Sequence, residues 1–400
     1  MLRIVDSDTH INEPADLWQS RLPAALRDRA PKVLRGSHGG QVWSFEGGKR
    51  TASITPLCNV LGVSPVKWEL LCQDYGDLPP GAGAPEPRLR DMDIDMVDAH
   101  VLYPTYVMAG AQVYSKRDRG LQIACVRAYN DWISEFASYN PDRLYALGTL
   151  PVTGVEDALE EARRVRELPG IRAIQMTAFP NGSTQSNPSA DEPFWSLMEE
   201  MEMPCAIHVG FSEGGEIEAA GEAADERESK DSFGTLTLAR LNQERQAVST
   251  IPLMSQFILG GILERHPRLR LGLAEVGIGW IPFFLEQTTF NFMRHRFWTN
   301  DHLSMLPKDY FRRQCFATFQ EDYYGLRNRD LIGVECLQWS SDYPHSGTDW
   351  PNSQNSITNQ MRGIPEEEQR LILGGNALRM FGIDEAKLPS RGPGPPASAR

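Results

Sequence analysis

The sequence lacks several features that would assign it to a class of protein at once. It has no Cys-x-x-Cys pair, and its six cysteines are scattered along the chain. We therefore expect reduced thiols, not a disulfide framework or a zinc ribbon. No apolar run approaches the roughly 18 residues that a membrane span requires, and the first residues show no signal-peptide pattern. These absences predict a cytoplasmic protein that does not cross a membrane.

Positive charge is also scarce. The chain carries 40 Lys and Arg against 53 Asp and Glu, a net charge of -13. Nucleic-acid binding depends on clustered Lys and Arg, so no nucleic-acid partner is expected, and anionic membrane surfaces are disfavoured. The hydrophobic content of 41% is ordinary for a globular protein and is sufficient for a sizeable core. The composition is therefore that of an ordinary soluble globular protein.

Regular alternation of strands and helices is present instead. Strand-like runs, several of them continuously apolar, occur at 4–10, 100–104, 144–150, 171–177, 204–210, 269–276, 314–319 and 337–342. Helices are expected between them at 119–139, 155–168, 194–203, 235–266 and 280–294. Continuous apolar runs are typical of parallel strands that are buried on both faces. Eight such units predict an α/β fold, a distorted (β/α)8 TIM barrel. The alternative is an open doubly wound sheet, but no G-x-G-x-x-G follows the first strand.

We expect a single domain over residues 1–385 that is interrupted twice. A long insertion, 11–90, follows the first strand and contains a hairpin-like stretch at 41–50. Insertions of this length usually cover an active site or form an interface. Residues 211–232 form an acidic, Gly/Ala-rich loop, which is either a solvated surface loop or a lid. The Pro/Gly/Ser-rich segment 386–400 predicts a disordered tail.

Ionisable side chains stand where four of the expected strands end. Asp8 and His10 close the first strand, where alternation places them on the same face. His208, Glu275 and Asp342 close the fifth, sixth and eighth strands. Barrels of this kind gather their chemistry at the carboxyl ends of the strands, and imidazole with carboxylate binds Zn, Mn and Fe alike. Together these residues predict a metal site. Each one alone has an ordinary alternative, since an Asp at a strand end often caps a helix and a single His is often a hydrogen-bonded core residue.

Five segments are similar to one known family. They are Asp6–Trp18, Ile207–Gly210, His266-Pro267 with Leu271–Trp280, Ser341–Pro344 and Gly375–Phe381. Together they resemble the amidohydrolase-related proteins, in the branch that includes aminocarboxymuconate-semialdehyde decarboxylase, over roughly residues 4 to 385. The resemblance implies a barrel enzyme whose divalent metal is bound by Asp8, His10, His208 and Asp342.

Two departures from the better-known decarboxylase of that family add negative charge to the site. That enzyme begins with His-x-His, whereas this chain has Asp8-x-His10, and its base position is often His where this chain has Glu275. The fourth strand, 171–177, carries no lysine that could supply a bridging carbamate. A hydrolase with a carbamate-bridged metal pair is therefore disfavoured.

The same residues support three kinds of reaction. A single Zn, Mn or Fe ion could activate water against an acyl substrate, with Asp342 or Glu275 moving the proton. It could equally hold a substrate carboxylate for non-oxidative decarboxylation. We expect one of these two, hydrolysis or decarboxylation of a small organic substrate in catabolism or secondary metabolism. The alternative is a non-haem diiron monooxygenase with Glu275 and His345 as further ligands of two irons. A second alternative is an inactive barrel that serves as a binding scaffold.

Residues around this set carry weaker predictions. His345, three residues after Asp342, is predicted to act in catalysis with Asp342 and Glu275. Glu13 is a metal ligand, an acceptor of a hydrogen bond from His10, or a cap of the turn at Pro14. The family and the long insertions predict a homodimer. His295 and His302 are expected to face its second subunit.

Overall fold

The parallel sheet predicted from the sequence organises the computed structural model. The structure describes residues 2–36, 40–46, 48, 50–53, 74–106, 111, 114–115, 117–209, 211, 247–299, 303–345 and 347–389. Within these residues one sheet has the strand order β1-β5-β6-β7-β8-β9-β10-β11, with neighbours parallel. The strands are β1 Val5–Ile11, β5 Ala99–Pro104, β6 Leu144–Thr149, β7 Ile171–Met176, β8 Cys205–His208, β9 Leu271–Ala274, β10 Cys315–Phe319 and β11 Leu337–Trp339. All eight predicted strands are therefore present.

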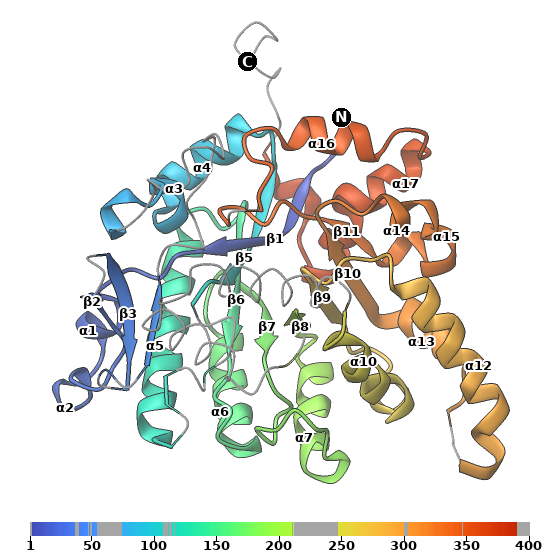
Figure 1. The fold of residues 1–400 in the computed structure, drawn as a ribbon, viewed down its shortest axis with the longest axis horizontal. Helices are drawn as coiled ribbons and strands as arrows, with labels where there is room; N and C mark the ends of the chain where they lie inside the picture. The colour runs from blue at the N-terminus through green and yellow to red at the C-terminus, as the bar shows by residue number, and fades with distance from the viewer. Residues whose placement is uncertain are drawn as a thin grey trace, which may run out of the picture.

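The sheet curls into a nearly closed barrel (Figure 1). Its first and last strands meet through backbone hydrogen bonds just beyond β11. The amide of Asp342 donates to the carbonyl of Asp8 at 3.1 Å, and the amide of His10 donates to the carbonyl of Tyr343 at 2.6 Å. The predicted (β/α)8 barrel is thus confirmed, and its point of closure lies among the predicted site residues.

Helices surround the barrel (Figure 1). They are α5 Arg119–Ser138, α6 Val155–Arg166, α7 Pro188–Glu200, α10 Thr250–Leu259, α11 Ile262–Arg265, α12 Ile281–Thr299, α13 Pro307–Gln314, α14 Tyr323–Arg327, α15 Arg329–Ile332, α16 Ser353–Gln360, α17 Glu366–Arg370 and α18 Asn376–Phe381. One predicted helix, 235–266, is wrong in its described part. It is broken between α10 and α11, where Gly261 has φ +74°, a left-handed conformation that ends a helix.

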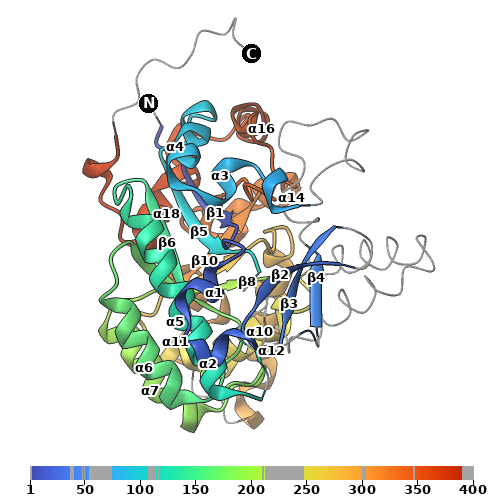
Figure 2. The same cartoon turned by 90° about the vertical axis from the view of Figure 1, so that its left-hand side faces the viewer.

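The insertion after β1 forms a small layer of its own. It contains α1 Leu17–Arg21, α2 Ala24–Arg27, the antiparallel strands β2 Lys32–Arg35, β3 Gln41–Phe45 and β4 Arg50–Ser53, then α3 Pro80–Gly83 and α4 Pro85–Ile94. Figure 2 shows the small sheet with α1 and α2 on one side of the barrel. Trp43 of β3 packs against Trp18 at 5.1 Å and against Tyr106, just after β5, at 5.2 Å between ring centroids. The insertion therefore docks at the carboxyl end of the barrel.

Two predicted segments are only partly described by the structure. Of the acidic loop 211–232 only Phe211 is described, and of the predicted tail 386–400 only residues 386–389 are described. Of the two histidines predicted to face a second subunit, His295 is exposed on α12 and His302 lies outside the described residues, so the homodimer stays a prediction. In the described part of the chain, no helix is both long and apolar enough to cross a membrane.

Candidate metal centre

The ionisable residues predicted from the strand ends lie together at the carboxyl end of the barrel. Asp8 and His10 come from β1, His208 is the last residue of β8, and Glu275 follows β9 directly. Asp342 lies beyond β11, in the segment that closes on β1. All are buried except Glu275, whose side chain is 18% exposed. The site is thus a closed cluster with Glu275 on its more open side.

Distances within the cluster are those of neighbouring ligand atoms. His10 Nε2 lies 3.0 Å from His208 Nε2, 3.6 Å from Asp8 Oδ1 and 3.5 Å from Asp342 Oδ1. His208 Nε2 lies 3.8 Å from Asp8 Oδ1 and 3.3 Å from Glu275 Oε2. The structure therefore brings all five predicted metal-site residues to one point.

His345 joins the cluster from the loop after β11. Its Nδ1 lies 2.9 Å from Asp342 Oδ1, and its ring stacks on His10 with the centroids 3.8 Å apart. Thr105 Oγ1 lies 3.3 Å from its Nε2. Ligand atoms of Asp8, His10 and His208 form one compact group, and those of His10, Asp342 and His345 form a second, each within 4.8 Å. The two groups share His10.

Backbone contacts orient these side chains. His10 Nδ1 lies 2.8 Å from the carbonyl oxygen of Pro104. Because a carbonyl oxygen only accepts, Nδ1 carries the hydrogen and the Nε2 lone pair points into the cluster. Glu275 and Asp342 have φ of 57° and 58°. This left-handed conformation costs a residue with a side chain about 1 to 2 kcal/mol, so the surrounding contacts hold both carboxylates against local strain.

Thr318 of β10 connects the backbone of Glu275 to the carboxylate of Asp8. Its hydroxyl accepts a hydrogen bond from the Glu275 amide at 3.0 Å and donates to Asp8 Oδ2 at 3.4 Å. Sequence reasoning missed this residue, because a threonine in a strand is ordinary. The position of Thr318 at the end of the seventh strand, between the strands of Glu275 and Asp342, was the signal that could have found it.

Burial and like charge dominate the electrostatics. Burial raises the pKa of Asp8 well above its usual value, and the nearby Asp342 and Glu275 raise it further. Burial lowers the pKa of His10 well below its usual value, and His345 and His208 add to this. Burial also lowers the pKa of His345 to about 4. Neutral imidazoles thus face crowded carboxylates, an arrangement that a bound cation would stabilise.

The donor set fits a divalent metal ion. Asp8 Oδ1 is buried and accepts no hydrogen bond from the described residues, although it lies 3.6 Å from His10 Nε2 and 3.8 Å from His208 Nε2. A buried carboxylate oxygen normally has a partner, so this atom is accounted for if it faces a cation. Nitrogen and oxygen donors of this kind suit Zn, Mn and Fe.

Neighbouring residues take structural positions. Both carboxylate oxygens of Glu13 lie 3.2 Å from the amide nitrogen of Tyr106 and accept a hydrogen bond from it. Glu13 therefore holds the segment after β5 in place. Asp322 accepts from the amides of Ile278 and Gly325, both at 2.7 Å, and thereby caps α14 and fixes the segment after β9.

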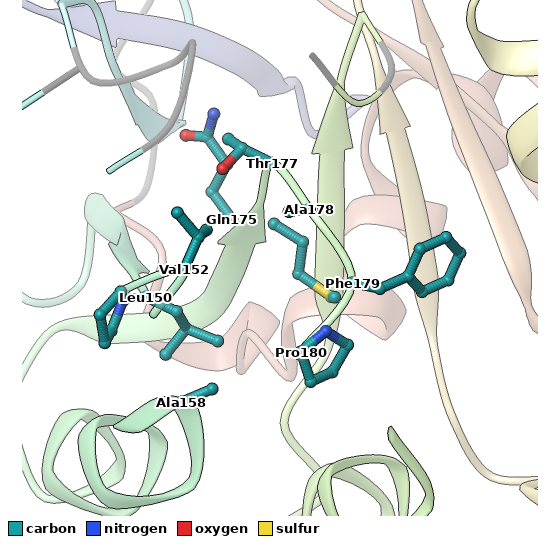
Figure 3. Close-up of a pocket in the computed structure, with 10 residues that line it drawn as sticks. Leu150, Val152, Ala158, Gln175, Thr177, Ala178, Phe179 and Pro180 are labelled. Atoms are coloured by element: carbon teal, nitrogen blue, oxygen red, sulfur yellow. The ribbon is translucent and has the colours of Figure 1, made fainter. Parts of the chain in front are cut away.

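A small pocket between β6, β7 and α6 contains none of the cluster residues in its lining (Figure 3). It is lined by Leu150, Pro151, Val152, Ala158, Gln175, Met176, Thr177, Ala178, Phe179 and Pro180. None of these side chains is ionisable, so this pocket offers no acid–base group.

The sequence profile of the amidohydrolase family matches residues 5–383. The chain belongs to this family. The resemblance noted in the sequence is therefore confirmed over nearly the whole chain.

Curated relatives of this amidohydrolase carry the names of decarboxylases. The chain is 26% identical over 310 residues to 2-amino-3-carboxymuconate-6-semialdehyde decarboxylase of Dictyostelium discoideum, covering 76% of this chain and 78% of that one. It is 24% identical over 340 residues to gamma-resorcylate decarboxylase of a Polaromonas species, covering 78% and 94%.

Solved structures share the fold. An amidohydrolase from Mycobacterium avium subsp. paratuberculosis K-10 superposes with a TM-score of 0.74 at 21% identity, covering 95% of this chain and 99% of the other. A dihydroxybenzoic acid decarboxylase from Polaromonas sp. JS666, with bound manganese and the inhibitor 2-nitroresorcinol, gives 0.63 at 15% identity, covering 97% and 99%. At these identities the likeness establishes the barrel fold alone.

Proposed function

We propose that this amidohydrolase is a metal-dependent, non-oxidative decarboxylase of a small carboxylic acid of the aromatic or unsaturated kind. The observation that carries the proposal is the buried cluster of Asp8, His10, His208 and Asp342, with Glu275 on its open side. The decarboxylase names of the curated relatives support this reaction over hydrolysis. The manganese in one structural neighbour supports a divalent ion.

In this proposal Asp8, His10, His208 and Asp342 hold the metal. The bound ion supplies a Lewis acid for the substrate carboxylate or for an oxygen next to it. His345 orients Asp342 through the 2.9 Å contact at Nδ1. The burial of the cluster keeps water away from the reacting carbon, which favours proton transfer over attack by water.

Glu275 is the proposed proton donor. Its Oε2 lies 3.3 Å from His208 Nε2, and it is the most exposed member of the cluster, so a substrate can reach it. Its proton passes to the ring or alkenyl carbon that carries the carboxylate. The carbon–carbon bond then breaks, CO2 leaves, and Glu275 is left as a carboxylate that must be protonated again before the next turnover.

The experiment is a substrate screen under nitrogen with manganese-, zinc- and iron-loaded enzyme. A panel of hydroxylated benzoic acids and unsaturated dicarboxylic acids is supplied, and CO2 release is measured together with the remaining substrate. We expect CO2 and the decarboxylated product in equal amounts, and at least a 100-fold loss of rate in Glu275→Gln, the size of a typical acid–base contribution. Turnover of esters or lactones without CO2 would overturn the proposal in favour of hydrolysis.

One observation favours a second candidate, the diiron monooxygenase. His345 completes a second donor group with His10 and Asp342, next to the group of Asp8, His10 and His208. The shared Nε2 of His10 can bind only one ion, so a second iron would depend on the carboxylates of Asp342 and Glu275. Metal analysis after anaerobic purification separates the two candidates. Two irons per chain and substrate turnover that requires O2 and a reductant would replace decarboxylation by oxygenation.

A further inference from the structure

The strand ends of the barrel differ in the kind of side chain that they carry. The ionisable side chains of the cluster come from β1, β8 and β9 and from the segment after β11. The ends of β6 and β7 carry uncharged hydrogen-bonding side chains instead. Thr149 is the last residue of β6, and Gln175 and Thr177 lie together at the end of β7 (Figure 3). All of these strand ends lie at the carboxyl end of the barrel, where barrel enzymes bind their substrates.

The side chains of Thr149 and Gln175 point into the barrel. A Cβ atom on Gly148 would lie 2.7 Å from the side chain of Val165 in α6, so position 148 faces the outer helices. Because side chains alternate along a strand, Thr149 faces inward. Ala173 belongs to the cluster of buried apolar side chains that fills the barrel, and Gln175 follows it by two residues on the same face of β7. Thr149 and Gln175 are paired in the register of β6 and β7, so they are neighbours.

This uncharged pair lies between two parts of the metal cluster. In the sheet order, β6 is two strands from β1 and two strands from β8. Neighbouring strands are about 4.8 Å apart, so the backbone of Thr149 is no more than about 10 Å from either strand. Thr105, just after β5, continues the row on one side, since its Oγ1 lies 3.3 Å from His345 Nε2. On the other side the register of β7 and β8 places Thr177 beside His208. A small substrate at the cluster can therefore reach these side chains.

The hydroxyl of Thr149 is the observation that points to a ligand. The residue is 3% exposed, and its Oγ1 has no hydrogen-bond partner among the described residues. Its backbone is held from behind by Asn130 of α5. The Thr149 amide donates to Asn130 Oδ1 at 2.8 Å, and the Thr149 carbonyl accepts from Asn130 Nδ2 at 3.0 Å. A buried hydroxyl normally has a partner, because an unpaired one costs free energy. A fixed strand end with an unpaired hydroxyl toward the site is suited to contact a ligand.

We propose that Thr149 and Gln175 bind an uncharged oxygen substituent of the substrate, a hydroxyl or a carbonyl, while the substrate carboxylate lies at the metal cluster. This inference rests on the proposed function and adds the side chains that recognise the rest of the substrate. A threonine hydroxyl and a glutamine amide each donate and accept hydrogen bonds, so they can pair with either kind of oxygen. Neither side chain is charged. A second carboxylate would therefore lose its water there without gaining a counter-charge from this pair, and it should be disfavoured.

The first test measures the binding of substituted benzoic acids to the manganese-loaded protein by isothermal titration calorimetry. The acids carry a hydroxyl, formyl, methyl or carboxyl group at ring position 3, and a second series carries the same groups at position 4. In at least one series we expect the hydroxyl or formyl acid to bind at least about tenfold more tightly than the methyl acid, because a methyl group leaves both polar side chains unpaired. The stronger of the two oxygen acids identifies the substituent.

Two results of this titration would overturn the subsite. One is a methyl or carboxyl acid that binds as tightly as the oxygen acids in both series. The other is the failure of every acid to bind.

The second test is Thr149→Val, which keeps the shape of the side chain and removes its hydroxyl. We expect the preference for the oxygen acid over the methyl acid to fall to within about threefold, through weaker binding of the oxygen acid alone. Thr149→Ser keeps the hydroxyl and is the matched control that should retain most of the preference. Manganese affinity should be unchanged in both variants, because Thr149 is not a member of the cluster. An equal loss of affinity for every acid in Thr149→Val would indicate a packing role and overturn the proposal.

Urea unfolding of the ligand-free variants gives a measurement that does not involve any acid. If the hydroxyl of Thr149 waits for a ligand, its removal leaves no other group unpaired, and Thr149→Val should unfold at the same or a higher urea concentration than the wild type. Unfolding at a clearly lower concentration would show that the hydroxyl is already paired in the free protein, for instance with a buried water. That result would overturn its assignment to the substrate.

The outcomes separate this subsite from the reaction. Binding that depends on Thr149, without CO2 release from any acid, would keep the subsite and overturn decarboxylation. Release of CO2 with an unchanged preference in Thr149→Val would keep decarboxylation and overturn the subsite.

Discussion

Two groups of buried polar residues lie next to each other around β1. They differ in whether each polar group has a hydrogen-bond partner of the opposite kind. In the first, Arg88 donates to the His10 carbonyl at 2.7 Å, to Thr9 Oγ1 at 3.0 Å and to His100 Nδ1 at 3.1 Å. Asp6 accepts from the amide and the hydroxyl of Ser341. Donors and acceptors are matched there, as expected where buried polar groups hold a fold together.

The second group is the cluster at the carboxyl end of the barrel, where hydrogen-bond acceptors face other acceptors. Carboxylates crowd one another around Asp8, and the Nε2 atoms of His10 and His208 lie 3.0 Å apart. Such a cluster is unfavourable by itself, and burial increases the cost. The comparison teaches that burial of a polar residue does not identify a functional site. Mutual crowding of acceptors is the stronger indication, because a bound cation would stabilise such an arrangement.

Asp8→Asn should give the largest effect on metal affinity, and the sign of its effect on stability should depend on whether metal is bound. The amide removes one crowded carboxylate, so we expect the metal-free protein to gain about 1 kcal/mol or more in its free energy of unfolding. Metal affinity should fall more than about 100-fold. This exceeds the usual loss of affinity when a residue that only hydrogen-bonds a metal ligand is replaced. Urea unfolding with and without chelator, together with elemental analysis, measures both. A metal-free protein that loses stability would show that the cluster is a satisfied network.

Arg88→Met should act in the opposite way. It removes a buried cation from matched acceptors, and we expect a loss of about 3 to 5 kcal/mol in the free energy of unfolding, whether or not metal is present. Urea unfolding of the metal-free protein measures it. Equal metal affinity of the folded variant and the wild type would support the distinction between the two groups. A loss of metal affinity without a loss of stability would contradict it.

Thr318→Val tests the residue whose hydroxyl connects the Asp8 carboxylate to the backbone of Glu275. The change keeps the shape of the side chain and removes the hydroxyl that donates to Asp8 Oδ2. We expect metal affinity to fall about 10-fold to 100-fold, as for other outer partners of ligands. Competition with a chelating dye provides the measurement, and Thr318→Ser, which keeps the hydroxyl, is the matched control that should retain most of the affinity.

Ser341→Ala should destabilise the protein less than Arg88→Met. It removes the hydroxyl donor to Asp6 and leaves the Ser341 amide bond to the same carboxylate in place. We expect a loss of about 1 to 3 kcal/mol in the free energy of unfolding and less than about a tenfold change in metal affinity. A larger change in metal affinity than that of Thr318→Val would contradict the separation of the two groups.

The sequence predicted the strands well because strands buried on both faces read as apolar runs. Their ends were less predictable. The eighth strand was expected to reach Asp342 but ends at Trp339, and Asp342 itself adopts a left-handed conformation that a strand does not allow. The helix expected over 235–266 breaks at Gly261 for a similar local reason. Propensity and periodicity do not resolve a single residue of this kind.

The site residues at strand ends were predicted because barrel topology converts strand ends into neighbours. Thr318 was missed because its role depends on an amide and a carboxylate from two other strands. His345 was uncertain because a loop decides whether it turns inward. The ligand roles of Asp8, His10, His208, Glu275 and Asp342 stay predictions that the metal measurements test.

The seam of the barrel has a consequence for how the protein is made. Asp8 lies near the start of the chain and Asp342 near its end, and the two meet only when the segment after β11 closes on β1. During synthesis the ribosome must therefore release nearly the entire barrel before the complete ligand set exists. Loading of the proposed metal into the full set of ligands would then be a late event that reports completed folding.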